Sequence, residues 1–188
     1  MHSETRDLNL SETEGALAAA VLELVRHTRE QDSPGPEHIA RFALFSTEAL
    51  LEERPELSRL LPQETLDLAS GDPHHLTSIE TGTQHGDVAD ELEHALWPEG
   101  CAGGYIQARI RGAVDGAPGA GPAPVFVAAG ALNTGETFSA VAREGEDLRV
   151  GRDLIPELVA ALCGSLGIDS PNARVAAPTD RKSTRLNS

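Results

Sequence analysis

The feature that most constrains the fold is a run of strand patterns in the second half of the chain. Residues 106–110 alternate between apolar and polar side chains, which is the period-two pattern of an antiparallel strand with one buried face. Residues 125–132 are nearly all apolar, residues 133–135 supply Asn-Thr-Gly turn chemistry, and residues 136–143 return. A short strand at residues 148–150 follows a second turn. Strands joined by such tight turns predict an antiparallel meander rather than a parallel sheet with helical crossovers.

Helical spacing and capping residues predict helices in the first half of the chain. Ser11-Glu12-Thr13-Glu14 is a capping box, in which the Ser11 hydroxyl and the Glu14 carboxylate each accept from the other residue's amide. Apolar residues then recur at helical spacing over residues 12–30. Thr47 is the expected cap of a short helix through Leu50 and Leu51, and Pro55 starts a second turn that ends near Leu61.

Two more helices are expected, one on each side of the strand run. Asp87 is the expected N-cap of the first, and Trp97-Pro98 ends it. Asp153 is the expected cap of the second, with Pro156 in its first turn, and Gly167 closes it. Glu91, in the first of these helices, is interpreted as part of a solvated acidic face.

The remaining segments complete an α+β chain. Strands are expected at residues 41–46 and from residue 76 onward, and the polar stretch at residues 62–75 between them is expected to be a loop. The predicted fold class is therefore α+β, an antiparallel β-sheet meander with helices packed mainly on one face.

The acidic composition excludes several classes of function. The formal net charge is −15, and no basic stripe is present that could displace counterions from nucleic-acid phosphates. Anionic membrane surfaces are disfavoured for the same reason, and no apolar run approaches the roughly 18 residues of a membrane span. The acidity is interpreted as a source of solubility, the alternative being electrostatic steering of a basic partner. A polar N-terminus without a signal-peptide pattern, and only Cys101 and Cys163, predict a cytoplasmic protein with reduced thiols.

No catalytic, metal or cofactor template fits the chemistry-bearing residues. His74, His75 and His85 lie near acidic residues but lack metal-ligand spacing, so a solvated loop is the preferred interpretation. The glycine-rich stretch at residues 112–121 lacks the residues and the helix that a phosphate loop requires. Cys101 follows His94 by seven residues, but no third group orients the pair. We therefore predict no catalytic residue, no metal site and no cofactor.

The last eight residues differ from the rest of the chain. Lys182 is the only lysine among 15 basic residues, and residues 181–188 resemble a translated sequencing-adapter peptide. We expect this segment to be a non-native tail, the alternative being a genuine basic tail. If the native chain extends further, its true C-terminus is then missing. The expected organisation is a flexible N-terminus at residues 1–10, one α+β domain at residues 11–168 and a flexible tail at residues 169–180.

Three segments, at residues 41–57, 95–104 and 151–162, together resemble an uncharacterised actinobacterial family named after a propionibacterial locus tag. The resemblance covers about residues 40–166, and the preference for arginine over lysine agrees with a GC-rich actinobacterial origin. No activity, cofactor or catalytic residue is established for that family, so the resemblance implies none here.

These expectations favour a non-enzymatic cytosolic binding or accessory protein of unknown molecular function. The alternative is an enzyme with a dispersed site of acidic and histidine residues in the region of residues 72–87. An interaction surface is predicted at Trp97, Arg109 and Arg111, although a lone Trp before a proline is more often a core residue. The expected partner is another protein or a second copy of the chain, not nucleic acid.

Overall fold

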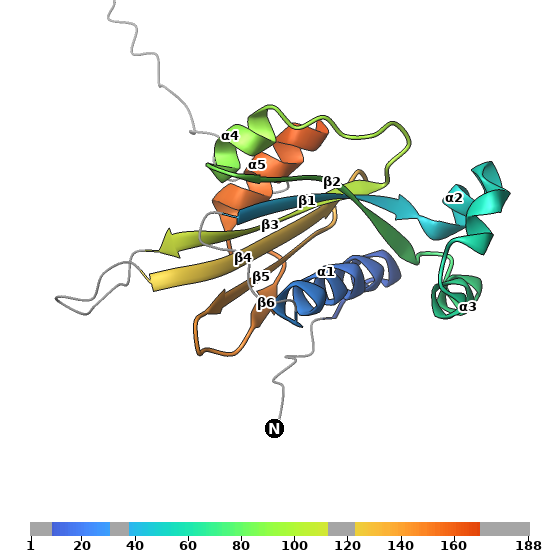
Figure 1. Ribbon diagram of the computed structural model, residues 1–188, viewed down its shortest axis with the longest axis horizontal. Coiled ribbons are helices and arrows are strands. Elements are labelled where there is room, and N and C mark those ends of the chain that lie inside the picture. The colour runs from blue at the N-terminus through green and yellow to red at the C-terminus, as the bar shows by residue number, and fades with distance from the viewer. Residues whose placement is uncertain (1–8, 31–37, 113–122, 170–188) are drawn as a thin grey trace, which may run out of the picture.

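The computed structural model describes residues 9–30, 38–112 and 123–169 (Figure 1). Predictions made for residues 1–8, 113–122 and 170–188, including the tail at 181–188, lie outside these ranges. The helices are α1 (Glu12–Glu30), α2 (Thr47–Glu53), the 3₁₀ helix η1 (Pro55–Arg59), α3 (Gln63–Gly71), α4 (Val88–Glu93) and α5 (Pro156–Leu166). The strands are β1 (His38–Ser46), β2 (Leu76–His85), β3 (Gly103–Gly112), β4 (Ala123–Leu132), β5 (Thr137–Arg143) and β6 (Arg149–Gly151).

The six strands of the described residues form one antiparallel sheet in the order β2-β1-β3-β4-β5-β6. Strands β3 to β6 follow one another as the predicted meander, while β1 lies between β2 and β3. The turn between β4 and β5 uses Gly135 at φ 104°, a conformation that favours glycine. The α+β class with an antiparallel sheet is confirmed.

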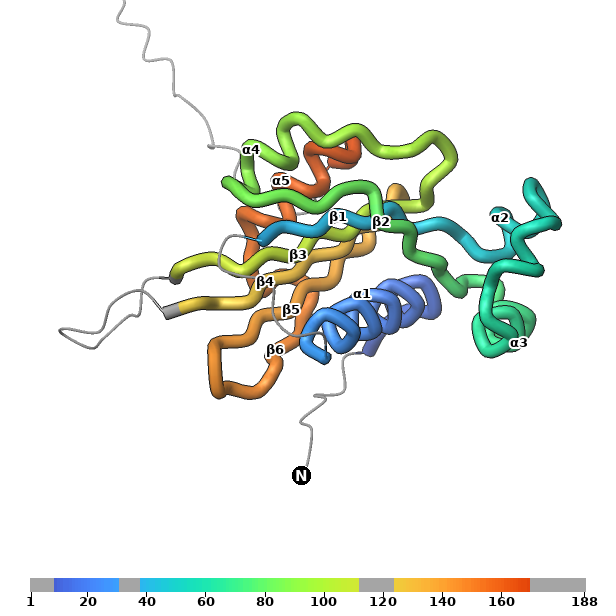
Figure 2. Tube along the Cα trace, in the orientation of Figure 1, coloured from blue at the N-terminus to red at the C-terminus, as the bar shows by residue number. Residues whose placement is uncertain are grey.

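The helices cover both faces of the sheet, which corrects the expectation that they pack mainly on one face. Helix α1 lies against one face over β4 and β5, and α5 lies against the other over β3 and β4, with α4 beside it (Figure 2). The reason is the nearly continuous apolar run of β4, whose alternate residues enter two separate cores. Phe126, Ala128 and Leu132 join the α1 core, and Val127 and Ala129 join the α5 core.

Strand β3 is also buried on both faces, so Gln107, expected on a polar face, lies in the interior. Both the oxygen and the nitrogen of its amide are hydrogen-bonded. The Tyr105 hydroxyl donates to Gln107 Oε1 at 2.7 Å, and Gln107 Nε2 donates to Thr28 Oγ1 at 2.7 Å. Burial also raises the pKa of the Tyr105 phenol, which keeps this donor protonated. The network therefore joins the end of α1 to β3 without leaving a polar atom unpaired.

Three helix ends lie where the sequence predicted them. Ser11 N donates to Glu14 Oε2 at 2.8 Å and Glu14 N donates to Ser11 Oγ at 3.2 Å, so the capping box is confirmed. Asp87 is the N-cap of α4, and Gly167 ends α5 in the left-handed conformation at φ 72°.

Three local predictions are wrong. Ser46 rather than Thr47 is the N-cap of α2, because its Oγ accepts from Ala49 N at 3.3 Å. Residues 63–71 form helix α3 rather than a loop, because Pro62 precedes the helix and the Gly71-Asp72-Pro73 break falls at its end instead of inside it. Helix α5 begins at Pro156 with Ile155 as N-cap, so Asp153 does not cap it. Proline already has the φ of a first helical residue and no amide to satisfy, which allows a start without a side-chain cap.

Within the described ranges, no helix has both the length and the apolar character needed to cross a bilayer.

Close approach of α1 to the sheet requires glycine at position 130. A Cβ atom built there would lie 2.7 Å from Val21 Cγ2 and 3.0 Å from Leu17 Cδ1. Gly130 faces Tyr105 in the β3–β4 register, at the centre of the α1 core. A side chain at this position must therefore displace α1 or force the Leu17 and Val21 side chains out of their rotamers.

Replacing Gly130 by alanine tests this packing. We expect Gly130→Ala to lower the free energy of unfolding by about 1–3 kcal/mol, the usual cost of overpacking a core. Gly164→Ala is the control, because no atom lies within 4 Å of a Cβ built at this helical glycine. The control should raise stability by up to about 1 kcal/mol through helix propensity. Urea unfolding measures both, and equal or greater stability of Gly130→Ala would contradict the packing.

Candidate functional site

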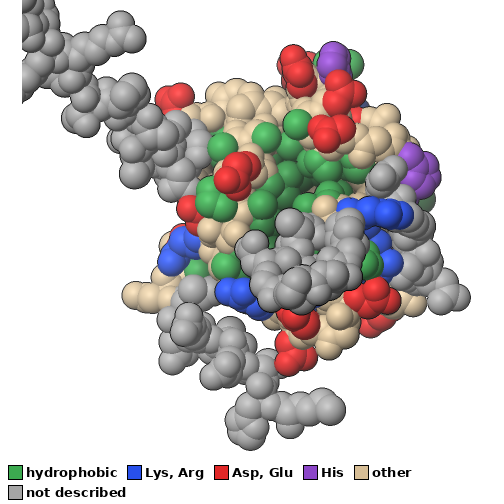
Figure 3. All heavy atoms as spheres, turned by 90° about the vertical axis from the view of Figure 1, so that its left-hand side faces the viewer, with side chains coloured by type: hydrophobic (Ala, Val, Ile, Leu, Met, Phe, Trp, Pro, Cys, Tyr) green, Lys and Arg blue, Asp and Glu red, His purple; other side chains and the backbone are tan. Residues whose placement is uncertain are grey.

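An apolar groove opens at the end of the sheet where β3 finishes and β4 begins, and hydrophobic side chains gather in the hollow seen in Figure 3. Its volume is about 700 Å³, within the range of roughly 300–1,000 Å³ typical of ligand sites. The apolar lining residues come from the strands and from the segments of α4 and α5, namely Ile39, Val88, Ala89, Ile110, Val127, Ile155, Leu158 and Ala161. We call this feature the α4–α5 groove.

The α4–α5 groove exists because α4 is short and begins at a sharp turn. Strand β2 ends at His85, and Gly86 then adopts φ 152°, where a side chain would be strained. Asp87 Oδ1 accepts from Ala89 N at 2.9 Å and from Asp90 N at 3.2 Å, which fixes the start of α4. With only six residues, α4 covers part of the sheet face and leaves the rest open.

The floor of the α4–α5 groove is continuous with the core beneath α5. Ile39, Val127 and Leu158 are buried members of that core and line the groove from below. Ile110, at the open side, is 38% exposed, so apolar surface runs from the interior out to solvent. A groove of this kind offers apolar contacts to a ligand, and water solvates its apolar lining poorly.

Charges of both signs border the α4–α5 groove. Asp87 and Glu157 stand at the starts of α4 and α5, and Arg109 and Arg111 stand at the end of β3. Two acidic and two basic residues thus border the groove, in a chain whose formal net charge is −15. The groove is therefore defined by its apolar lining rather than by charge of one sign.

The structure separates the residues predicted as one interaction surface. A Cβ on Gly104 would lie 2.6 Å from the Trp97 ring, so this face of β3 is the one that α4 and α5 cover. Gln107 points to α1 on the opposite face. Strand alternation directs Arg109 and Arg111 to the α1 face as well, away from Trp97, although both border the α4–α5 groove where β3 ends.

Trp97 holds the segment after α4 against the sheet. Its ring packs over Gly104, and its Nε1 donates to Ser165 Oγ of α5 at 3.1 Å. Arg41 Cζ lies 5.4 Å from the ring centroid, a cation–π distance. These contacts make Trp97 a half-buried structural residue.

A buried ion pair beneath Trp97 was not predicted from the sequence. Arg41 Nη1 lies 2.9 Å from Glu91 Oε1, and the side chains are 12% and 8% exposed. The interpretation of Glu91 as part of a solvated face is therefore wrong. Arg41 also donates from Nε to Thr81 Oγ1 at 3.1 Å, where β2 carries an extra residue opposite β1. Breaking such a pair typically lowers the free energy of unfolding by about 3–5 kcal/mol. We therefore interpret the Arg41–Glu91 pair as one that stabilises the fold.

Residues 72–87, proposed above as a dispersed enzyme site, do not come together. Most of the segment is strand β2, and its histidines contact different parts of the molecule. His74 Nε2 lies 3.4 Å from Glu12 Oε2 of α1. His75 Nδ1 lies 2.8 Å from the buried Thr47 hydroxyl at the root of α2. The length of β2 separates His75 from His85 by roughly 30 Å at about 3.3 Å per residue.

His85 pairs instead with His38 across the edge of the sheet, next to the α4–α5 groove. The ring centroids are 5.6 Å apart at an interplanar angle of 63°. Burial, and then the neighbouring His85, lower the pKa of His38, while Glu80 opposes the shift. Among the described residues, no three His, Cys, Asp or Glu side chains are grouped so that they could hold a metal ion.

The cysteines are free and lie in apolar surroundings. Cys163 is buried in α5, and Cys101 is half-buried before β3. Burial raises the pKa of both thiols, which disfavours the thiolate form that a nucleophile requires. The nearby His94 instead lies 2.9 Å, through Nδ1, from the Asp90 carbonyl of its own helix. The pair therefore lacks the geometry and the ionisation of a catalytic Cys–His couple.

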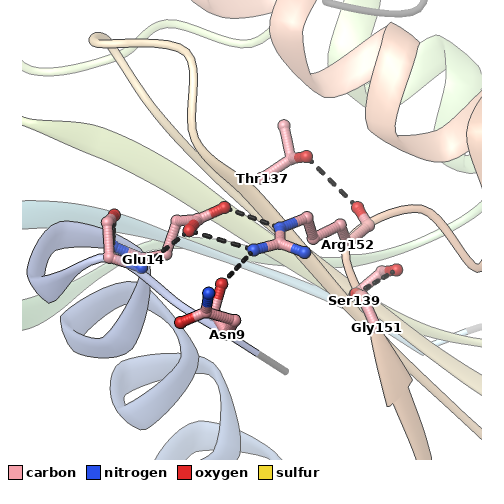
Figure 4. Close-up of polar contacts among 7 residues, drawn as sticks. Asn9, Glu14, Thr137, Ser139, Gly151 and Arg152 are labelled. Atoms are coloured by element: carbon pink, nitrogen blue, oxygen red, sulfur yellow. Dashed lines mark hydrogen bonds and ion pairs between the residues drawn. The ribbon is translucent and has the colours of Figure 1, made fainter. Parts of the chain in front are cut away.

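A polar cluster joins the start of α1 to the segment after β6 (Figure 4). Arg152 donates from Nε to Glu14 Oε1 at 2.6 Å, and from Nη2 to Glu14 Oε2 at 3.1 Å and to the Asn9 carbonyl at 2.9 Å. Thr137 Oγ1 donates to the Arg152 carbonyl at 3.2 Å. These contacts connect α1 with the segment after β6, so the cluster fastens α1 to the β6–α5 segment.

In comparisons with known proteins, no family model matches this chain, and neither a curated protein nor a solved structure is significantly similar to it. The resemblance to the actinobacterial family stays a prediction.

The Glu14–Arg152 pair predicts a pH dependence of stability. The hydrogen bonds from Arg152 and then from the Ser11 amide lower the pKa of Glu14 from 4.5 to about 2. The unfolded chain therefore binds this proton first, and the stabilisation, complete above about pH 4.5, is lost as pH falls towards 2. Glu14→Gln should be less stable than wild type at neutral pH, and the difference should shrink over that interval.

Urea unfolding at several pH values measures this difference. The effect is expected to be modest, because Arg152 is half-exposed and water screens the pair. Adding Arg152→Gln to Glu14→Gln should cost little more, since the pair is already broken. If the difference in stability between Glu14→Gln and wild type stays constant from neutral pH to pH 2, the contact with Arg152 does not lower the pKa of Glu14.

Proposed function

We propose that this protein is a non-enzymatic binding protein that holds an apolar ligand in the α4–α5 groove. The observation that carries the proposal is the lining of the groove, which continues the core beneath α5 out to the exposed Ile110 side chain. A folded domain usually covers such surface, and uncovered apolar hollows with a few polar groups at the rim are typical of ligand sites.

The chemistry of the groove limits the class of ligand. The mostly apolar lining favours a molecule that is uncharged or weakly charged over a nucleotide or another polyanion. The volume of about 700 Å³ suits a small molecule or one apolar chain of it. A cytoplasmic location is part of the proposal, supported by the two free thiols.

The dispersed-enzyme alternative receives less support from the arrangement of side chains. His74, His75 and His85 each contact a different element, and Asp87 is used to cap α4. General acid–base chemistry needs such groups within reach of one reacting atom. Binding is therefore the function that the geometry supports better.

Filling the α4–α5 groove tests the proposal. Ala161 lines the groove, and its neighbour Ala160 is exposed on the same helix, so Ala160→Trp is a matched control for Ala161→Trp. The probe is the uncharged apolar dye N-phenylnaphthylamine, whose fluorescence rises in apolar surroundings. We expect Ala161→Trp to weaken binding by at least about tenfold, because the indole occupies the space of the ligand. Ala160→Trp should leave binding unchanged.

Circular dichroism and thermal unfolding establish that both variants fold. Equal loss of binding in the two variants would place the dye elsewhere. A wild-type protein that fails to bind the dye, or binds it no better than Ala161→Trp does, would refute the α4–α5 groove as an apolar ligand site.

A further inference from the structure

The segment of chain that connects β1 to β2 projects from the opposite end of the sheet as a helical arm (Figures 1 and 2). We define the helical arm as residues 48–71, which contain most of α2 and all of η1 and α3. Its root is fixed by Thr47, whose hydroxyl lies 2.8 Å from both Thr77 Oγ1 and His75 Nδ1. Beyond this root, the arm packs mainly against itself.

The helical arm carries more leucine than its packing uses. None of its residues is buried, although it contains seven leucines, at positions 50, 51, 57, 60, 61, 66 and 68. Leu60 is 77% exposed and Leu68 is 56% exposed. Leucine is among the residues most often buried in folded domains, and clustered exposed leucines mark surfaces that another molecule covers.

The charge of the helical arm indicates what kind of molecule covers it. Six carboxylates and two arginines give the arm a formal net charge of −4, and all eight side chains are exposed, namely Glu48, Glu52, Glu53, Arg54, Glu56, Arg59, Glu64 and Asp67. An acidic surface around exposed leucines complements a helix with leucines on one face and lysines or arginines beside them. Two copies of the arm would instead bring like charges together.

We propose that the helical arm is a docking surface for a basic amphipathic helix of a partner protein. Leu60 and Leu68 supply the apolar contacts, and the exposed carboxylates of the arm supply the charge complementarity. The arm lies at the end of the sheet away from the α4–α5 groove, so the two sites are separate.

Removing the exposed leucines tests the apolar part of the proposal. The probe is a synthetic helical peptide with leucines on one face and lysines on the other, followed by fluorescence anisotropy. We expect Leu60→Gln/Leu68→Gln to weaken binding at least about tenfold, as loss of central apolar anchors does. The control is Leu96→Gln, which alters a leucine 84% exposed outside the arm and should leave binding unchanged. Because these leucines are exposed, the variants should fold normally, which circular dichroism verifies.

Neutralising the carboxylates tests the electrostatic part. Glu52→Gln/Glu56→Gln/Glu64→Gln should weaken binding at least about tenfold at low salt, with a smaller salt dependence. The control triple variant, Glu99→Gln/Glu144→Gln/Glu146→Gln, changes the net charge equally outside the arm and should have little effect. This comparison separates a local acidic surface from the overall charge of the protein.

Four outcomes would overturn the proposal. The wild-type protein does not bind the lysine peptide, or it binds an otherwise identical glutamate peptide equally well. The control variants lose as much affinity as the arm variants. Sedimentation shows a wild-type dimer that Leu60→Gln/Leu68→Gln abolishes, in which case a second copy covers the helical arm.

Discussion

The central strands of the sheet are buried on both faces, and this double burial constrains the rest of the structure. Helix α1 and the Trp97 segment approach the sheet closely where a side chain is absent, at Gly130 and Gly104. A buried polar group on the covered part of these strands needs a partner inside, as Gln107 has in Tyr105 and α1. The cover stops towards the ends of the sheet, as at Ile110, which is 38% exposed.

Both candidate interaction sites lie at such ends. At one end, the short α4 and the late start of α5 leave core residues open to solvent and form the α4–α5 groove. At the other end, the helical arm extends past the sheet and has no core of its own to enter. The fold thus places the apolar groove and the acidic, leucine-bearing arm at opposite ends of the sheet.

Local signals in the sequence predicted the elements better than their arrangement. The capping box at Ser11, the N-cap at Asp87 and the turn before β5 depend on neighbouring residues, and all three were predicted correctly. The insertion of β1 between β2 and β3, and the pairing of Arg41 with Glu91, depend on contacts between distant segments. The α4–α5 groove has no sequence motif for the same reason, because its lining comes from five separate segments of the chain.

Methyl-group NMR during titration with N-phenylnaphthylamine tests the central claim most directly. If the groove left open by α4 and α5 is the ligand site, the methyl signals of Ile39, Val88 and Ile110 should shift as dye is added. Those of Leu17 and Val21, in the core beneath α1, should stay in place. Shifts confined to the α1 core, or spread evenly over the molecule, would contradict the account.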